Sequence, residues 1–219
     1  MLDWPHHLEI LALRAFSPPR LFVRLYGLPW YSGMLRSWVA GAKIPVGADV
    51  LEIGCGPGML CRDLAERAGT VTGIDRSAAM VRHAADNTAD LPDVVIKQGA
   101  LPSLPCDGAA YDVVLGSSLI NIVPDRHAAL AEIARVTRAG GMASLLFPLP
   151  GFFQIADLAD DLNLRGFSRA ALRQWAHHAR TVDFSHVNDS FHQAGFRSLT
   201  SWSMFDGCIG VVTGCKPHS

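Results

Sequence analysis

The stretch Val50-Leu51-Glu52-Ile53-Gly54-Cys55-Gly56-Pro57-Gly58 decides the fold of this chain of 219 residues. Its first half is an apolar run typical of a short buried strand, and its second half is a turn in which every second residue is glycine. Another apolar run, Val71 to Asp75, ends in a carboxylate 17 residues after Gly58. A strand, a glycine turn, a helix and an acid at the tip of the next strand are the elements with which α/β sheets bind a cofactor that carries a ribose.

The spacing of these glycines separates two cofactor classes. Dinucleotide-binding turns follow G-x-G-x-x-G, and the last glycine of that pattern would stand at Met59. Here the glycines follow G-x-G-x-G, and Glu52 adds a negative charge beside the turn that would repel a pyrophosphate. A cofactor with a cationic centre and an amino group is therefore favoured, and a glycine turn without any ligand is the alternative.

Residues 51–58 resemble motif I of the class I S-adenosylmethionine-dependent methyltransferases, E/D-x-G-x-G-x-G. The segment 135–141 resembles the R-V-L-K-P-G-G sequence that precedes the fifth strand in the methyltransferase type 11 group, with Thr137 for Leu and Ala139 for Pro. That group includes the menaquinone and ubiquinone biosynthesis methyltransferases. The resemblance extends over residues 45–216, and it implies S-adenosyl-L-methionine as the cofactor and S-adenosyl-L-homocysteine as its product.

The remaining sequence predicts an α/β fold, a Rossmann-like doubly wound sheet. Apolar runs that are expected to form parallel strands alternate with segments of helical periodicity, at residues 50–53, 71–75, 94–97, 111–116 and 142–147. Two last runs, 198–204 and 208–215, are joined by Phe205-Asp206-Gly207, and Asp-Gly in so short a connection predicts a hairpin. The prediction is a seven-stranded sheet with a C-terminal antiparallel hairpin strand, where a dinucleotide fold would end on another parallel strand.

Residues 46–219 are predicted to form the cofactor-binding domain, and residues 1–45 an N-terminal helical lid, so that the chain is a single domain. Side chains that precede helical segments are expected to cap them, at Ser77, Asp125 and Ser168. The helix before the fifth strand is expected to end at Gly140-Gly141, and the segment 157–164 has no pattern that decides its form.

The resemblance implies how the cofactor is held. The glycines of the turn would pass under its methionine part, Asp75 would bind the ribose hydroxyls, and Arg76 or Met80 would cover an adenine face. Ala100 departs from the family, in which many members carry an aspartate that accepts from the adenine amino group, although the backbone N–H of Leu101 stays available. The implied cofactor contacts are Tyr26, Glu52, Gly54, Cys55, Gly56, Gly58, Asp75, Arg76, Met80, Gly99, Ala100, Leu101, Ser117 and Ser118.

Methyl transfer by direct displacement at a sulfonium carbon requires alignment and the exclusion of water, and it requires neither a protein nucleophile nor a metal. No motif identifies a base, so the catalytic residue is unknown, with Asn121 and Tyr26 as candidates. Asn121 either orients a substrate or caps a turn, and the resemblance implies that Tyr26 reaches the methionine carboxylate from the lid.

An apolar or aromatic acceptor is expected, because aromatic residues stand both in the lid and after the fifth strand. The residues predicted to line its pocket are Trp30, Tyr31, Asn121, Phe152 and Phe153. The alternative for most of the lid aromatics is that they only pack the helices onto the sheet.

The composition is that of a globular protein, with 49% hydrophobic and 18% charged residues. The formal net charge of −1 gives no bulk attraction to nucleic acid, and no apolar run reaches the length of a membrane span. The start of the chain lacks the pattern of a signal peptide, so a cytoplasmic location is expected. Five cysteines without a C-x-x-C pair favour reduced thiols, and neither they nor the nine scattered histidines predict a metal site.

Three other functions remain open at this point. A nicotinamide-dependent oxidoreductase would share the strand and the turn, although Met59 and the terminal hairpin disfavour it. A catalytically inactive cofactor-binding subunit or regulator is favoured by Ala100 and by the missing base. Residues 1–45 combine aromatic side chains with an excess of basic ones, which allows weak peripheral association with an anionic membrane. A small-molecule acceptor is the partner expected of the lead function, and the acceptor, the methylated atom and the oligomeric state stay undetermined.

Overall fold

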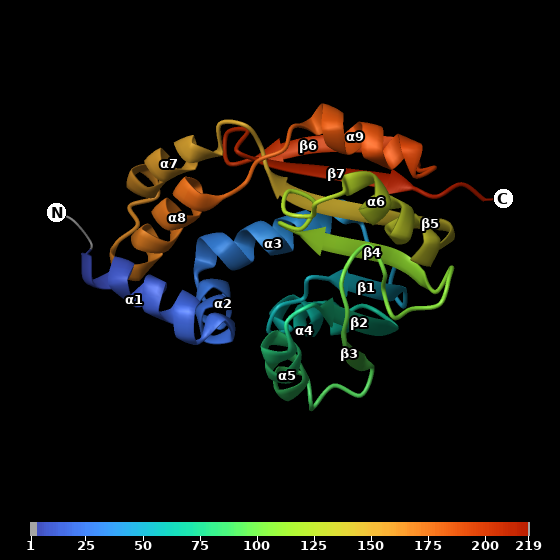
Figure 1. The fold of residues 1–219 in the computed structure, drawn as a ribbon, viewed down its shortest axis with the longest axis horizontal. Coiled ribbons are helices and arrows are strands. Elements are labelled where there is room, and N and C mark those ends of the chain that lie inside the picture. Colours follow the sequence, from blue (N-terminus) through green and yellow to red (C-terminus); the bar gives the residue numbers. More distant parts are fainter. Residues whose placement is uncertain (1–3, 219) are drawn as a thin grey trace.

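A seven-stranded sheet runs through the centre of the structure, a computed structural model that describes residues 4–218 (Figure 1). Its strands are β1 Asp49–Ile53, β2 Thr70–Asp75, β3 Val94–Gln98, β4 Tyr111–Ser117, β5 Thr137–Pro148, β6 Arg197–Met204 and β7 Ile209–Cys215. They lie side by side in the order β3-β2-β1-β4-β5-β7-β6. Strands β1 to β5 are parallel, whereas β7 is antiparallel to both of its neighbours. The predicted doubly wound sheet with a C-terminal antiparallel hairpin is therefore confirmed.

Helices cover both faces of the sheet, which explains why its central strands are near-continuous apolar runs. On one face lie α3 Pro29–Ala42, α4 Met59–Ala65 and α5 Ala78–Asn87, and on the other lie α6 Arg126–Val136 and α9 Phe184–Gln193. In β4, Val113 and Leu115 are buried with α3 and α4, whereas Val114 is buried with α6 and α9. Successive side chains of one strand thus fill two separate cores, as the alternation of a pleated strand requires.

Helix α3 is fixed on its face of the sheet by a buried polar contact. The indole Nε1 of Trp38, which has no exposed surface, donates to Oγ of Ser144 on β5 over 2.9 Å. Ser144 Oγ lies 2.8 Å from the hydroxyl of Thr213 on β7. Because these three polar atoms satisfy one another's hydrogen bonds, the helix has one preferred position on the sheet.

A group of helices stands beyond the carboxyl ends of the strands, and we call α1, α2 and α8 the helical cap (Figure 1). The elements here are α1 Trp4–Phe16, α2 Pro18–Tyr26, the short 3-10 turn η1 Phe152–Gln154, α7 Ile155–Asp161 and α8 Gly166–His178. The cap has a small core of its own, in which Ile10 and Leu21 meet Phe167. Segments that precede β1 and segments that lie between β5 and β6 therefore build the cap. Of the predicted lid of residues 1–45, α1 and α2 belong to the cap, whereas α3 packs on the sheet.

The structure corrects several predicted element boundaries. Ser168 does not cap α8, which begins at Gly166, because the Ser168 hydroxyl instead accepts from Nε1 of Trp30 over 2.9 Å. The undecided segment forms most of α7, and β5 begins at Thr137, ahead of Gly140. The caps at Ser77 and Asp125 are confirmed, since their side chains accept from the backbone N–H groups three residues later. No helix within residues 4–218 is long and apolar enough to cross a membrane.

Candidate active site

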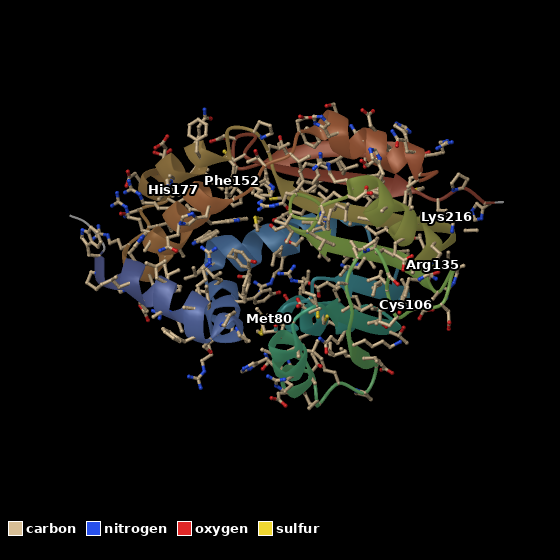
Figure 2. The ribbon with its side chains drawn as sticks, viewed as in Figure 1. Met80, Cys106, Arg135, Phe152, His177 and Lys216 are labelled. Atoms are coloured by element: carbon tan, nitrogen blue, oxygen red, sulfur yellow. The ribbon has the colours of Figure 1, made fainter. Side chains whose placement is uncertain are left out.

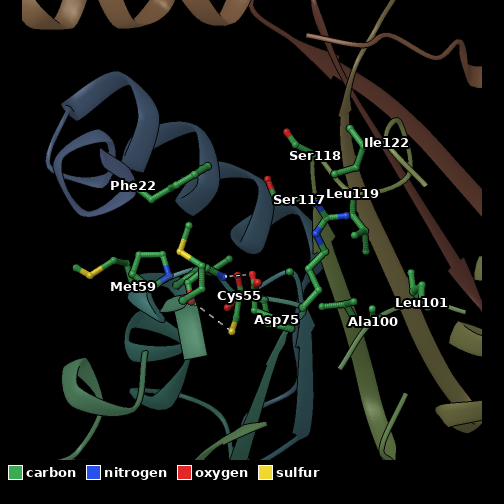
Figure 3. Close-up of a pocket in the computed structure, with 18 of the residues that line it drawn as sticks. Phe22, Cys55, Met59, Asp75, Ala100, Leu101, Ser117, Ser118, Leu119 and Ile122 are labelled. Carbon is green, nitrogen blue, oxygen red and sulfur yellow. Dashed lines mark hydrogen bonds between the residues drawn. The ribbon is translucent and has the colours of Figure 1, made fainter. Parts of the chain in front are cut away.

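The candidate site is a crevice of about 340 Å³ at the carboxyl ends of the parallel strands. It lies where the strand order reverses between β1 and β4, which is where open α/β sheets bind ligands. Figure 3 shows Phe22 of α2 on one side of the crevice, Ser118 and Ile122 on the other, and Cys55 and Asp75 between them. The predicted cofactor residues that line it are Tyr26, Glu52, Gly54, Cys55, Gly56, Asp75, Arg76, Met80, Gly99, Ala100, Leu101, Ser117 and Ser118.

The three glycines of the turn have different tasks. All adopt a positive φ, with values of 78° at Gly54, 53° at Gly56 and 79° at Gly58. A Cβ built at Gly56 meets nothing within 4 Å, so this glycine leaves open space beside the crevice. A Cβ at Gly58 would lie 3.0 Å from Cβ and 3.1 Å from Cα of Ala84 on α5, and Gly58 does not line the crevice. Gly58 thus lets two helices approach, and its predicted cofactor contact is replaced by a packing role.

Asp75 holds the turn and faces the crevice at the same time. Its Oδ2 accepts from the backbone N–H of Gly56 over 2.9 Å, and its Oδ1 accepts from that of Ser77 over 2.8 Å. Each carboxylate oxygen can accept further bonds. The side chain is therefore fixed in orientation by the backbone while it keeps free acceptor positions for hydroxyl donors in the crevice.

Glu52 is a buried acid at the base of the crevice. Only 4% of the residue is exposed, and its Oε2 lies 3.0 Å from Sγ of Cys61, which donates to it. Burial raises the pKa of Glu52 to about 7, the Cys61 hydrogen bond works against this, and the negative charge of Asp75 adds to it. The ionised form of Glu52 is thus poorly compensated, and a cation bound in the crevice would stabilise it.

Tyr26 lines the crevice, but its hydroxyl has a protein partner. It donates to Oδ2 of Asp63 on α4, and the same oxygen lies 3.2 Å from Nε of Arg36. Burial, and then the hydrogen bond to Asp63, raises the pKa of Tyr26. The sequence predicted that this hydroxyl reaches a methionine carboxylate. In the structure it donates its only proton to the Asp63 carboxylate instead.

A second cavity of about 450 Å³ adjoins the crevice, and we call it the acceptor cavity. The predicted pocket residues Trp30, Tyr31 and Asn121 all line it. It shares four lining residues with the crevice, namely Phe22, Tyr31, Ser118 and Ile122. Three of the five predicted pocket residues therefore line one cavity, which lies beside the crevice and between the cap, α3 and the loop after β4.

The two phenylalanines after β5 do not line this cavity, and their prediction as pocket residues is wrong. Phe152 is fully buried, with its ring centroid 4.8 Å from that of Trp175 (Figure 2). Phe153 is 67% exposed and lines a different hollow beside Trp4 and His177. The 3-10 turn η1 directs these adjacent side chains apart, one into the core beneath the cap and one outward.

Asn121 has one partner and one unpaired atom. Its Nδ2 donates to the backbone carbonyl of Arg180 over 3.0 Å, which ties the loop after β4 to the segment that follows α8. Its Oδ1 is buried and has no hydrogen-bond partner within residues 4–218. Asn121 is therefore a link between two loops beside the acceptor cavity, and the structure gives it no turn to cap.

Several lining residues were missed by the sequence reasoning, because they come from the far side of the cap. Trp175, His178 and Arg180 reach the acceptor cavity from α8 and the residues after it, and Arg14 reaches it from α1. No local pattern marks them, since their placement depends on how the cap packs. Across residues 4–218, no three histidine, cysteine, aspartate or glutamate side chains are grouped so that they could hold a metal ion.

Comparisons with known proteins agree with this geometry. Residues 50–141 match the methyltransferase domain family. The chain is 29% identical to the demethylmenaquinone methyltransferase of Staphylococcus epidermidis over 192 residues, which covers 81% of this chain and 79% of that protein. It is 37% identical to the nocamycin O-methyltransferase of Saccharothrix syringae over 111 residues, or 48% of this chain and 39% of that protein. The chain spans only 28% and 39% of the length of two of the curated relatives that it matches.

The fold recurs in solved structures of low sequence identity. The complex of the Haloferax volcanii Trm112 methyltransferase activator with a methyltransferase contains a chain that superposes with a TM-score of 0.68 at 20% identity, covering 84% of this chain and 89% of that one. The sheet order, the glycine-lined crevice and the domain match together define a class of protein. Residues 50–141 form a methyltransferase domain, and the chain has the fold of the class I S-adenosylmethionine-dependent methyltransferases.

The residues of the crevice fit the cofactor of this class. Space is left open at Gly56, and Asp75 presents a fixed carboxylate with free acceptor positions. Glu52 lacks a compensating cation, and a sulfonium centre with its amino group would supply one. Ala100 lines the crevice as an exposed methyl group, so adenine recognition there depends on the backbone and on apolar contact.

Proposed function

We propose that the protein transfers a methyl group from S-adenosylmethionine to a small apolar or aromatic molecule by direct displacement. The observation that carries this proposal is the placement of Glu52, Gly56 and Asp75 around one crevice that opens into an aromatic-lined cavity. The relatives named demethylmenaquinone methyltransferase and nocamycin O-methyltransferase support a small acceptor.

Each of these residues has a distinct role in the proposal. When bound, S-adenosylmethionine supplies a methyl group on a cationic sulfur. Asp75 accepts from the ribose hydroxyls, Gly56 lets the chain approach the methionine part, and Glu52 attracts its positive charge. The cap covers the crevice and excludes water, which preserves alignment of the reacting atoms.

Tyr26 orients α4 in this proposal and does not act as a base. Its raised pKa and its hydrogen bond to Asp63 keep the phenol protonated at neutral pH. Tyr31 lies where the crevice meets the acceptor cavity, and its pKa is raised to about 12 by burial and then by Glu52. Both hydroxyls are thus hydrogen-bond donors, and neither serves as a base for the acceptor.

Calorimetric titration with S-adenosylhomocysteine, with NAD as a parallel ligand, tests the cofactor. We expect micromolar binding of S-adenosylhomocysteine and none of NAD. Binding of NAD alone would replace the proposal by an oxidoreductase. A second step supplies labelled S-adenosylmethionine and a metabolite extract, in which methyl transfer is expected. Cofactor binding without transfer to any acceptor would instead support a catalytically inactive cofactor-binding subunit.

A further inference from the structure

Part of the lining of the acceptor cavity is shared with the crevice, and the rest belongs to this cavity alone. Tyr31 and Ser118 belong both to this cavity and to the crevice, so a molecule in the cavity can present an atom to the crevice there. The rest of the lining comes from α1, α8 and the segment after α8. A bound acceptor therefore has its reacting end at the shared opening, and the rest of it contacts the residues that line this cavity alone.

The middle of the cavity is an aromatic wall. The ring of Trp30 lies 6.0 Å from that of Trp175, nearly parallel to it, and 5.6 Å from that of Tyr31, nearly perpendicular to it. Tyr31 and Trp175 are also 6.0 Å apart. Each ring is held by the other two, and Trp30 is held further by Ser168. Rigid aromatic rings of this kind favour a planar, unsaturated ligand over a flexible one.

Apart from Tyr31 of the aromatic wall, every titratable side chain of the described residues that lines this cavity is basic. Arg14, His178 and Arg180 line it, and among residues 4–218 no aspartate or glutamate does. No carboxylate of the described chain forms a salt bridge with either arginine. The pKa of His178 is lowered by burial and then by the positive groups around it, which include Arg14 and His177. No acidic side chain of the described residues lines the cavity beside these arginines, so an anionic group on a ligand would be attracted to them.

We propose, on the basis of the methyltransferase function above, that the acceptor is a planar aromatic anion. Its anionic group lies against Arg14 and Arg180, its ring lies on the wall of Trp30 and Trp175, and its methyl-accepting atom faces Tyr31. Both arginines are exposed, so they select and orient the acceptor, and their attraction is screened by salt.

A matched pair of fluorescent probes tests this selectivity without methyl transfer. Anilinonaphthalene sulfonate and the uncharged phenylnaphthylamine share one ring system and differ in the anionic group. Both are titrated into the protein loaded with S-adenosylhomocysteine, at low salt. We expect the anionic probe to bind about tenfold more tightly than the neutral one. Equal affinities, or tighter binding of the neutral probe, would overturn the proposal.

Substitutions then assign the preference to the cavity. The double variant Arg14→Gln, Arg180→Gln should reduce the preference for the anionic probe to roughly twofold. Its affinity for the neutral probe should be unchanged. Arg173→Gln is the matched control, because Arg173 is an exposed arginine of α8 that lines a different hollow. A preference that survives the double variant would overturn the proposal, and so would one lost in the control.

The outcome is separable from that of the proposed function. Calorimetry with S-adenosylhomocysteine is run on the same samples, so a protein that fails to bind the cofactor is recognised directly. An anion preference without methyl transfer supports the charged site and rejects the transferase activity. Methyl transfer without an anion preference supports the activity and rejects the charged acceptor.

Discussion

Asp75 connects the shape of the glycine turn to the recognition of a ligand. Its two oxygens accept from backbone N–H groups on either side of the crevice floor, at Gly56 and Ser77. A carboxylate held in this way needs no rearrangement when hydroxyl groups arrive. The same contacts mean that removing the side chain affects both the turn and the ligand.

Asp75→Ala should weaken binding of S-adenosylhomocysteine by roughly tenfold or more, because the ribose hydroxyls and two backbone N–H groups lose their acceptor. Calorimetric titration gives the affinity, and a thermal melt on the same sample gives the stability that is lost when the turn loses its two hydrogen bonds to Asp75. Asp93→Ala is the matched control, since Asp93 is an exposed aspartate just before β3 and outside the crevice. An unchanged affinity in Asp75→Ala would place the ligand elsewhere.

Glu52 makes the stability of the ligand-free protein depend on pH. Its pKa is about 7 in the folded chain and 4.5 when unfolded, so the folded state binds more protons between these values. Stability therefore falls as the pH rises through this window and stays lower above it. The shift corresponds to about 3 kcal/mol lost between about pH 4 and about pH 8.

Glu52→Gln should remove this dependence, because an amide resembles the protonated acid and does not ionise. The free energy of unfolding of Glu52→Gln, relative to that of the unmodified protein, is expected to increase by about 3 kcal/mol from about pH 4 to about pH 8. Urea denaturation at several pH values without ligand measures it. If the free energies of unfolding of the two proteins change with pH in parallel, burial does not raise the cost of ionising Glu52.

Among the structural elements, the turn between β1 and α4 contains one glycine that is needed for packing and another that leaves room beside the crevice. Gly58→Ala combines a positive φ with a clash against the backbone of α5, and it should destabilise the fold by about 2 kcal/mol. Gly56→Ala meets open space, so it should cost about 1 kcal/mol from the positive φ alone.

The ligand affinities should rank in the reverse order. Gly56→Ala is expected to weaken S-adenosylhomocysteine binding by roughly tenfold or more, because its methyl group occupies space next to the ligand, whereas folded Gly58→Ala should bind within about threefold of the unmodified protein. Melting temperatures and calorimetric affinities of both variants provide the comparison. Equal effects on binding would mean that the turn acts only as one rigid unit.

The helical cap depends on the seam between α2 and α8. The guanidinium of Arg24 lies 3.7 Å from the ring centroid of Phe167, which is 7% exposed and packs on Ile10 and Leu21. Phe167→Ala should reduce the free energy of local unfolding of α1, α2 and α8 by about 3 kcal/mol. The backbone amides of the sheet should stay as protected from hydrogen exchange as before.

Hydrogen exchange followed by mass spectrometry distinguishes this local effect from global unfolding. Phe153→Ala is the control, because Phe153 is 67% exposed and its truncation removes little packing. Faster exchange across β1 to β5 as well would show that the cap and the sheet unfold as one cooperative unit.

For the whole molecule, the sheet could be predicted because its information is local. Each central strand is an apolar run bounded by turn residues, and the caps at Ser77 and Asp125 depend on contacts within one helical turn. The crevice followed from this, because parallel strands bring their carboxyl ends to one edge of the sheet.

The cap could not be predicted in the same way, because its contacts join distant segments. Ser168 resembles a helix cap in sequence, yet its hydroxyl is taken by Trp30 from the other end of the chain. Phe152 and Phe153 are alike in sequence, and only the turn η1 decides which of them is buried. The basic lining of the acceptor cavity has the same origin, since tertiary packing alone brings Arg14 and Arg180 to one cavity.

The long sequence separation within the cap sets an order of events during synthesis. His7 contacts Gln174 across 167 residues, and Trp30 contacts Ser168 across 138. On the ribosome, α1 and α2 therefore emerge early. Their residues Ile10 and Leu21 stay uncovered until α8 has left the exit tunnel. The cofactor crevice takes shape before the cavity for the acceptor does, and a chain released early would expose an apolar surface that invites chaperones or aggregation.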